Sequence, residues 1–326
     1  MKRDPRQWAR AVLLALCPSA PVVLLAAPGD EPPRFEIAPP AAPGPLSFVV
    51  YGDTRFTARD HVANALARRA LVAKIADENP AAILIGGDLI YQGTDRNDYS
   101  VYHSETLEWD RRRIPVFPAL GNHEFHDCNP ASAASPCLEN WWQAFAELKL
   151  RPFRWYSVAI GREILALVLD SDSPLKPGSE ERRWLEREIT SAEAPVRFIL
   201  IVLHYPPVRD PVLPRGKDEA QVQRYLSAAA PTLHAQVIVV GSHVHNYERF
   251  SRDGVTYLVS GGGGAKPLPV FRMSGELSNL QTSVNFHFLR FTLDKERLTG
   301  TMVRFDAADQ SGNPWSEPDR FEIAAR

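Results

Sequence analysis

The chain has 326 residues, of which 44% are hydrophobic and 23% are charged. This is the composition of an ordinary globular protein, and it excludes general disorder and a protein with many membrane spans. The formal net charge is only −2, so no strong basic field indicates nucleic-acid binding. Three cysteines are too few for a scaffold that depends on disulfides.

The first 27 residues have the layout of a secretory signal peptide. Basic residues at positions 2, 3, 6 and 10 precede an apolar run over residues 11–27. We therefore expect an exported protein, periplasmic or secreted, with a signal peptide at residues 1–27. Pro18 and Pro21 make the run a poor permanent anchor, so no stable membrane span is expected after the signal is removed. The alternative is a frayed start of a cytosolic protein, rich in alanine and proline.

Residues 28–45 are rich in proline and predict a semi-rigid linker. Proline removes a backbone donor, so the interior of a helix and a central strand are both disfavoured here. No second linker and no internal repeat follow in the sequence. Residues 46–326 are therefore predicted to form one domain.

Within residues 46–326, short apolar runs alternate with amphipathic stretches. The runs are typical of strands buried on both faces and cover residues 46–51, 82–85, 116–120, 164–169, 198–203 and 237–240. Helical periodicity lies between them, over residues 60–78, 98–113, 138–150, 179–189 and 219–229. Further strands are expected at residues 255–260, 286–293 and 298–305. We predict an α/β fold, a layered β-sandwich of mixed sheets flanked by helices.

Polar side chains follow five of the predicted strands at the points where these strands end. The endings are Gly52-Asp53, Gly86-Gly87-Asp88, Gly121-Asn122-His123, Leu203-His204 and His243-Val244-His245. Ligands of open α/β sheets bind outside the carboxyl ends of the strands, so these side chains should share one rim. Carboxylate, amide and imidazole groups suit iron, zinc or manganese. Each ending alone fits a turn, a helix cap or a core histidine, but all of them in this order indicate a metal site.

This order of motifs resembles the calcineurin-like metallophosphoesterase superfamily over residues 51–249. Most members carry a metal-binding His two positions after the first Asp. Here that position is Arg55, which has no lone pair to offer a metal. In one branch, the purple acid phosphatases, a tyrosine three residues after the second Asp supplies the missing ligand, and Tyr91 stands there. The motif HVHNYER at residues 243–249 also resembles that branch.

The resemblance implies two metal ions, a ferric ion and a divalent iron, zinc or manganese. Carried over residue by residue, the first metal takes Asp53, Tyr91 and His245, the second takes Asn122, His204 and His243, and Asp88 bridges the two. A bridging carboxylate can hold two cations about 3.5–4 Å apart, and their charge acidifies bound water and clamps a phosphate. A phenolate suits a trivalent ion.

His123 faces the substrate in the resembled family, as a general acid or as a stabiliser of the transition state. We expect Glu124 to orient it. The alternatives are a structural histidine for His123 and a packed aromatic for Tyr91. His126, three residues further on, is expected at the surface.

The implied function is that of a purple acid phosphatase-like catalytic domain over residues 46–326, in which a metal-bound hydroxide attacks the phosphomonoester of a small molecule. Alternatives are a phosphodiesterase or nucleotide pyrophosphatase using the same site, and a non-catalytic binding protein on this scaffold. Plant-type purple acid phosphatases carry further histidines after the middle ligand, and none occurs between His204 and His234. Arg209, Arg215 or Lys217 would contact phosphate instead, or form a solvated loop. The physiological substrate and the oligomeric state do not follow from the sequence.

Three smaller features lie near the predicted site. Cys128 and Cys137 flank a short loop and are expected to form a disulfide in an exported protein, the alternative being two free thiols. Ser242 replaces the glycine that usually precedes the final histidine pair of the family. The run Gly261–Gly264 lacks the Lys-Ser/Thr of a nucleotide-binding loop, and we expect it to let the backbone pass close to the metal site.

Overall fold

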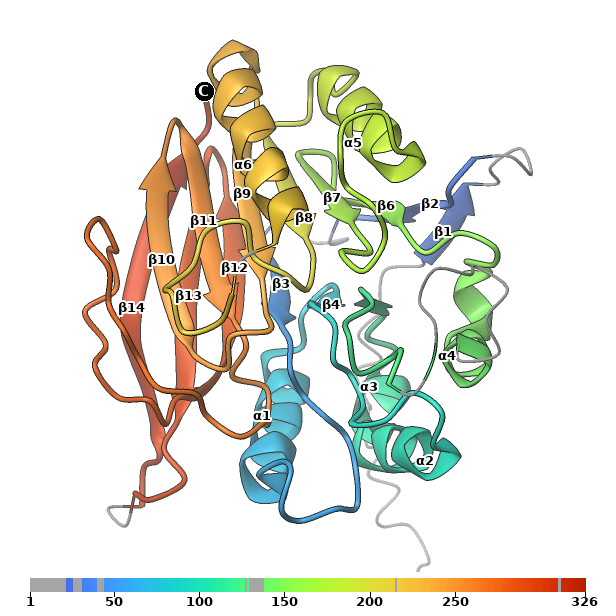
Figure 1. Ribbon diagram of the computed structural model, residues 1–326, viewed down its shortest axis with the longest axis vertical. Coiled ribbons are helices and arrows are strands. Elements are labelled where there is room, and N and C mark those ends of the chain that lie inside the picture. The colour runs from blue at the N-terminus through green and yellow to red at the C-terminus, as the bar shows by residue number, and fades with distance from the viewer. Residues whose placement is uncertain are drawn as a thin grey trace, which may run out of the picture.

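The computed structural model describes residues 22–25, 31–39, 44–126, 128, 138–214, 216–309 and 312–326. These residues form two β-sheets with helices outside them (Figure 1). Each sheet contains both parallel and antiparallel neighbours. The predicted fold class, mixed sheets in layers flanked by helices, is confirmed.

The smaller sheet has six strands in the order β14-β13-β12-β3-β4-β5. Their bounds are β3 Leu46–Tyr51, β4 Ile83–Ile85, β5 Val116–Pro118, β12 Phe286–Asp294, β13 Arg297–Phe305 and β14 Trp315–Ala324. β3, β4 and β5 run parallel, whereas β12, β13 and β14 pair antiparallel. The sequence did not predict β14, because this edge strand is largely exposed and carries few apolar residues.

The larger sheet has eight strands in the order β1-β2-β6-β7-β8-β9-β11-β10. Their bounds are β1 Val22–Leu25, β2 Arg34–Ile37, β6 Tyr156–Ile160, β7 Ile164–Val168, β8 Phe198–Val202, β9 Gln236–Gly241, β10 Tyr247–Arg252 and β11 Val255–Ser260. β7, β8, β9 and β11 are parallel neighbours. The carboxyl ends of these strands therefore lie at the same edge of the sheet.

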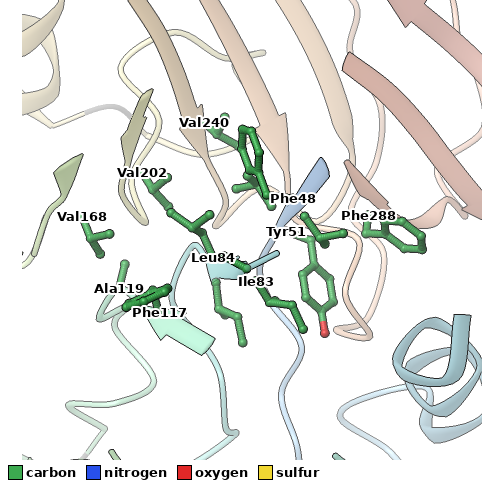
Figure 2. Close-up of a cluster of buried hydrophobic side chains, with 14 of the residues drawn as sticks. Phe48, Tyr51, Ile83, Leu84, Phe117, Ala119, Val168, Val202, Val240 and Phe288 are labelled. Atoms are coloured by element: carbon green, nitrogen blue, oxygen red, sulfur yellow. The ribbon is translucent and has the colours of Figure 1, made fainter. Parts of the chain in front are cut away.

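The central strands of the larger sheet are buried on both faces. In β8, Leu200 and Val202 contribute to the core between the sheets, while Ile199 and Ile201 pack with apolar residues of the outer helices. Figure 2 shows the inner core, where Val202 lies with Phe48 of the smaller sheet. Successive side chains of a strand point to opposite faces, so an all-apolar run is required when both faces are covered.

The helices overlap the five predicted stretches, but the stretch predicted over residues 98–113 forms two helices, and several ends differ by a few residues. They are α1 Ala65–Glu78, α2 Arg96–Glu105, α3 Leu107–Arg112, α4 Glu139–Ala144, α5 Glu180–Thr190 and α6 Lys217–Ala229, with 3-10 turns at Ala146–Leu148 and Ala230–Thr232. α1 begins where the Asn64 side chain accepts a hydrogen bond from the Ala67 N–H at 2.9 Å. Within the described part of the chain, no helix has the length and apolar character needed to cross a membrane.

The stretch predicted as a linker contains a strand of the larger sheet. β2 lies between β1 and β6, pairing antiparallel with the first and parallel with the second. The prediction that residues 28–45 hold no central strand is therefore wrong for residues 34–37. The prolines flank the strand at positions 33 and 39, so its four residues keep their backbone donors, and Phe35 and Ile37 are buried on one face.

The partner of β2 belongs to the segment predicted as a signal peptide. β1 pairs with β2 through Val22–Leu25. Residues 1–21 and 26–30, the rest of that segment and the start of the linker, lie outside the described residues. Export and signal removal stay predictions.

The role of β2 can be tested with Phe35→Ala. The Phe35 ring is 1% exposed and lies 5.5 Å from the Phe117 ring and 5.6 Å from the Tyr156 ring, centroid to centroid. Replacing this buried ring with a methyl group should lower the free energy of unfolding by about 3–5 kcal/mol, measured by urea denaturation. The control is Arg34→Ala at the exposed neighbouring position, which should leave it almost unchanged. Equal, small effects of both substitutions would show that β2 is only a linker.

Candidate metal centre

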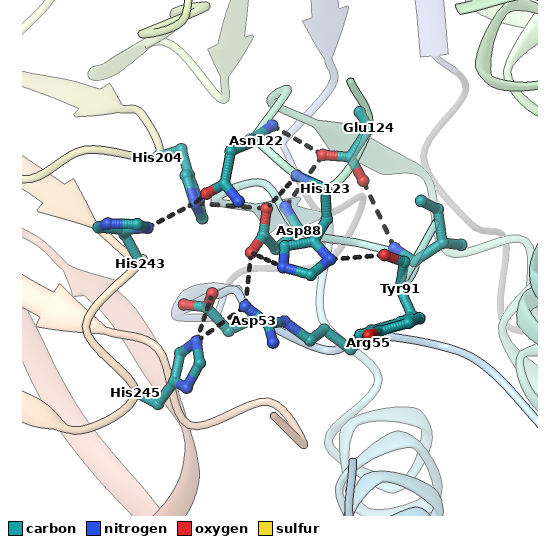
Figure 3. Close-up of polar contacts among 12 residues, drawn as sticks. Asp53, Arg55, Asp88, Tyr91, Asn122, His123, Glu124, His204, His243 and His245 are labelled. Carbon is teal, nitrogen blue, oxygen red and sulfur yellow. Dashed lines mark hydrogen bonds and ion pairs between the residues drawn. The ribbon is translucent and has the colours of Figure 1, made fainter. Parts of the chain in front are cut away.

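The predicted site residues come together where the two sheets meet. Figure 3 shows them converging from the strand ends. From the smaller sheet, Asp53 follows β3, Asp88 follows β4, and Asn122 and His123 follow β5. From the larger sheet, His204 follows β8, and His243 and His245 follow β9. The site thus spans both sheets, and its geometry depends on how the sheets pack.

The backbone of the site is held in a costly conformation. Asp53, Arg55, Asp88 and His243 have positive φ angles of 55°, 46°, 52° and 64°. Non-glycine residues rarely adopt this left-handed region, and such strain gathers at functional sites. Hydrogen bonds fix two of these turns to each other, from Asp53 N to Gly87 O at 3.1 Å and from Arg55 N to Asp88 O at 3.0 Å.

Three possible ligand atoms converge on a fourth, the Nε2 atom of His204. This nitrogen lies 3.3 Å from Asp88 Oδ1, 3.0 Å from Asn122 Oδ1 and 3.2 Å from His243 Nδ1. The other ring nitrogen, Nδ1, lies 3.0 Å from the Gly86 carbonyl and donates to it when it carries the proton. In that tautomer Nε2 is an acceptor facing two oxygen acceptors, an arrangement that a cation between them would relieve.

A second group of ligand atoms lies on the other side of Asp88. Asp53 is fully buried, and neither of its carboxylate oxygens has a hydrogen-bond partner among the described residues. Its Oδ1 lies 3.4 Å from His245 Nε2, while His245 Nδ1 donates to the Lys266 carbonyl at 2.6 Å. A buried carboxylate without donors is costly, and a bound cation would satisfy it.

The two groups share Asp88. Single ligand atoms of Asp53, Asp88 and His204 all lie within 4.8 Å of one another. One carboxylate therefore stands between both sets of donors, as the bridging position requires. The donor set, carboxylates with imidazoles and an amide, fits iron, zinc or manganese.

Charges in the cluster favour the metal-binding protonation states. Burial alone would raise the pKa of Asp88, but the neighbouring His204, His123 and Arg55 hold it well below its usual range. Burial, together with His204, lowers the pKa of His243 to about 2. At neutral pH the site therefore offers an ionised bridge and a neutral imidazole, the forms that bind metals.

His123 lies beside Asp88 with one ring nitrogen directed at it. Its Nε2 is 3.8 Å from Asp88 Oδ2, and its Nδ1 contacts the Tyr91 carbonyl at 2.5 Å. Burial lowers the pKa of His123. The Tyr91 ring lies against the His123 ring, with 5.3 Å between the centroids. The Arg59 guanidinium lies over the Tyr91 ring, with its Cζ 5.3 Å from the ring centroid. His126 is exposed, as expected, with its ring 4.5 Å from that of His123.

Glu124 does not orient His123, contrary to the prediction. The Tyr91 carbonyl is instead the hydrogen-bond partner of His123 Nδ1. The buried Glu124 carboxylate instead accepts backbone hydrogen bonds from Gly121 at 2.7 Å, Asp88 at 3.0 Å and Leu89 at 2.9 Å. Glu124 therefore ties the turns after β4 and β5 together and positions Asp88.

The turn glycines make room for the ligands. A Cβ on Gly121 would lie 2.5 Å from Asp88 Oδ1 and 2.9 Å from His204 Cγ. A Cβ on Gly261 would lie 2.6 Å from Asp53 Oδ2. The expected close passage of the Gly261–Gly264 backbone under the site is thus present.

Ser242 fits because two strand ends carry glycine. A Cβ on Gly52 would lie 2.2 Å from Ser242 Oγ, and one on Gly86 would lie 2.3 Å from the same atom. The Ser242 hydroxyl is buried and donates to the Ser260 carbonyl at 3.3 Å. The serine therefore fills the space between β3, β4 and β9, immediately below the site.

Two residues of this region were missed by the sequence analysis. The Tyr205 hydroxyl donates to Asp172 Oδ1 at 3.1 Å, and the Tyr205 ring lies 4.6 Å from that of His243. Asp172 comes shortly after β7, so the strand-end rule that found the other residues applies to it as well.

Of the basic residues considered for phosphate binding, Arg209 is placed near the cluster. Its charge contributes to the lowered pKa of His243, and its buried Nε and Nη1 have no hydrogen-bond partner among the described residues. Arg215 and the Lys217 side chain lie outside the described residues. Cys128 is disulfide-bonded, and its predicted partner Cys137 also lies outside them.

Comparison with known proteins agrees with this architecture. A family model described as Calcineurin-like phosphoesterase matches residues 46–247. The chain is 24% identical over 226 residues to the probable purple acid phosphatase 20 of Arabidopsis thaliana, covering 67% of this chain and 50% of that protein. It thus spans about half the length of the curated relatives it matches.

Two solved structures share the fold. A purple acid phosphatase from yellow lupin (Lupinus luteus) seeds aligns with a TM-score of 0.68 and 17% identity, covering 90% of this chain and 56% of that one. A dimetal phosphatase from Danio rerio aligns with a TM-score of 0.58 and 15% identity, covering 86% and 99%. At these identities the likeness is one of fold.

The packing of Ser242 yields a prediction about the base of the site. Gly86→Ala should lower the free energy of unfolding by about 1–3 kcal/mol, because the new methyl group collides with Ser242 Oγ. In the double variant Gly86→Ala/Ser242→Gly the nearest remaining contact is the Leu203 carbonyl at 3.6 Å, so most of the loss should be recovered. Urea unfolding of both variants and of Ser242→Gly measures the coupling. Additive losses would contradict the packing described here.

Proposed function

The chain belongs to the calcineurin-like phosphoesterase family, and from this premise we propose that it is a purple acid phosphatase-like enzyme that hydrolyses phosphomonoesters of small molecules. Members of the family generally hydrolyse phosphate esters. The observation that carries the proposal is the convergence of acceptor atoms at the strand ends, with Asp88 between two groups of ligand atoms. The distant similarity to plant purple acid phosphatases supports the branch.

The proposed ligand set is the one implied by the sequence. Asp53, His245 and Tyr91 would hold a ferric ion, and Asn122, His204 and His243 a divalent iron, zinc or manganese, with Asp88 shared. When bound, the two ions supply positive charge that acidifies water and binds the phosphoryl group. The chain's own part is to fix the ligands, and the carbonyl partners of His204 and His245 do this by orienting the rings.

His123 is the proposed catalytic residue beside the ions. Its Nδ1 is engaged by the Tyr91 carbonyl, so Nε2 is the atom left to face the cluster and a bound phosphoryl group. When the ring carries both protons, Nε2 can donate to a phosphoryl oxygen or to the leaving oxygen. The Tyr91 carbonyl fixes the ring, and Tyr91 thereby links the proposed acid to the proposed first metal.

Export is proposed as the setting of this activity. The disulfide of Cys128 supports it, because disulfides persist in oxidising compartments such as the periplasm. The basic and apolar pattern of residues 1–27 supports it as well. A phosphatase in this location would act on phosphate esters outside the cytosol.

Phosphatase activity is tested with two chromogenic esters. The wild type should hydrolyse p-nitrophenyl phosphate faster than bis-p-nitrophenyl phosphate, whereas the reverse order would favour the phosphodiesterase alternative. Asp88→Ala should lose turnover and metal together, because both groups of ligand atoms share this carboxylate. The control is Asp77→Ala, which removes an acid with a 70% exposed side chain. Full metal content in Asp88→Ala would show that the site is wrongly assigned, and no turnover of either ester by metal-loaded wild type would favour the binding-protein alternative.

The branch is tested with Tyr91→Phe. A phenolate bound to a ferric ion gives a charge-transfer band in the visible range, so iron-loaded wild type should be coloured. Tyr91→Phe keeps the ring against His123 and removes the phenolic oxygen, so the colour should disappear at matched iron content while the melting temperature stays nearly the same. A band that persists in the variant would assign Tyr91 to packing alone.

A further inference from the structure

The Arg55 guanidinium lies inside the candidate metal centre, between residues assigned to the first metal. Its Nη2 is 3.1 Å from Asp88 Oδ2 and 3.2 Å from His245 Nε2 (Figure 3). The side chain is 13% exposed, so it borders the opening of the site. Its Nε is buried without a hydrogen-bond partner among the described residues. A cation with unused donors therefore stands where a phosphate would approach.

Arg55 and a metal ion compete for the same atom of His245. Because His245 Nδ1 donates to the Lys266 carbonyl, the single lone pair of Nε2 is the acceptor site of this ring. It can accept the N–H of Arg55 or bind a metal, but not both. The positive guanidinium also repels a second cation at this position.

The backbone of Arg55 is fixed independently of its side chain. Its N–H donates to the Asp88 carbonyl at 3.0 Å, and its carbonyl accepts a hydrogen bond from Arg68 Nη1 at 3.2 Å. The guanidinium can therefore leave His245 by rotation about side-chain bonds while the turn after β3 stays in place. Its long side chain then keeps the charge near the mouth of the site.

We propose that Arg55 is the phosphate clamp of this enzyme, released from His245 when the first metal binds. A guanidinium offers planar, paired N–H donors that match two oxygens of a phosphoryl dianion. The inference rests on the proposed phosphatase function and adds a substrate-binding residue to it. It also makes binding of the first metal a condition for full phosphate binding.

The test compares Arg55→Met with the wild type by two binding measurements. Metal-free protein is titrated with Mn²⁺, and the Met variant should bind the ion that needs His245 more tightly, because its competitor is gone. The Mn²⁺-loaded proteins are then titrated with orthophosphate, and the variant should bind it roughly 10- to 100-fold more weakly, the worth of a charge-assisted hydrogen bond. These two shifts have opposite signs, which a general loss of structure would not produce.

Two controls accompany this variant. Arg297→Met makes the same charge change at a side chain that is 68% exposed and pairs with Glu322, and it should alter neither affinity. Arg55→Lys keeps the charge without the paired donors, so it should recover only part of the phosphate affinity. Circular dichroism and thermal unfolding establish that each variant is folded.

The outcomes separate the clamp from the phosphatase proposal. Weaker Mn²⁺ binding by Arg55→Met would make Arg55 a support of the metal site and overturn the clamp. Unchanged orthophosphate affinity would overturn it as well. Neither the Mn²⁺ titration nor the orthophosphate titration measures turnover. A wild type that hydrolyses neither ester would therefore reject the proposed function without deciding the role of Arg55.

Discussion

The burial of Asp53 and Asp88 side by side is the constraint on which the rest of this structure depends. Both carboxylates are fully removed from water, and Asp53 has no hydrogen-bond donor among the described residues. Keeping them there requires compensation, and the chain provides it through backbone and basic groups around Asp88. The backbone N–H of His123 donates to Asp88 Oδ1 at 2.9 Å, and Arg55 pairs with Oδ2. Both residues also adopt the left-handed backbone conformation, so the site combines buried carboxylates with strained turns.

Much of the fold could be predicted because local sequence and burial agree. The run at residues 198–203 is apolar throughout because β8 contributes side chains to two hydrophobic cores, and such a run can be recognised in the sequence. β2 could not be predicted in this way, because four residues flanked by prolines are too few to show a periodic pattern. Its place in the sheet comes from pairing with β6, more than a hundred residues away in the chain. Non-local pairing of a short strand is not encoded in local propensity.

The same division holds for the site. The convergence of its residues could be predicted because each of them follows an apolar strand, and the carboxyl ends of parallel strands lie at one rim of a sheet. The roles of Glu124, Arg55 and Ser242 could not, because each depends on neighbours distant in the sequence. Ser242 is compatible with this site only because Gly52 and Gly86 leave space for its hydroxyl. Glu124 acts on the backbone of the turn after β4 and not on the histidine next to it.

The charges of the cluster bear on how a site proposed to bind cations would also bind the anionic substrate proposed for it. Of the two buried carboxylates, Asp88 pairs with the Arg55 guanidinium, while His243 is neutral at physiological pH because burial lowers its pKa to about 2. Each bound metal ion would add positive charge without any negative group being added, so the loaded site would attract a phosphoryl dianion. Under the proposed clamp, Arg55 would make the loaded pocket selective for anions once a metal ion releases it from its imidazole partner His245.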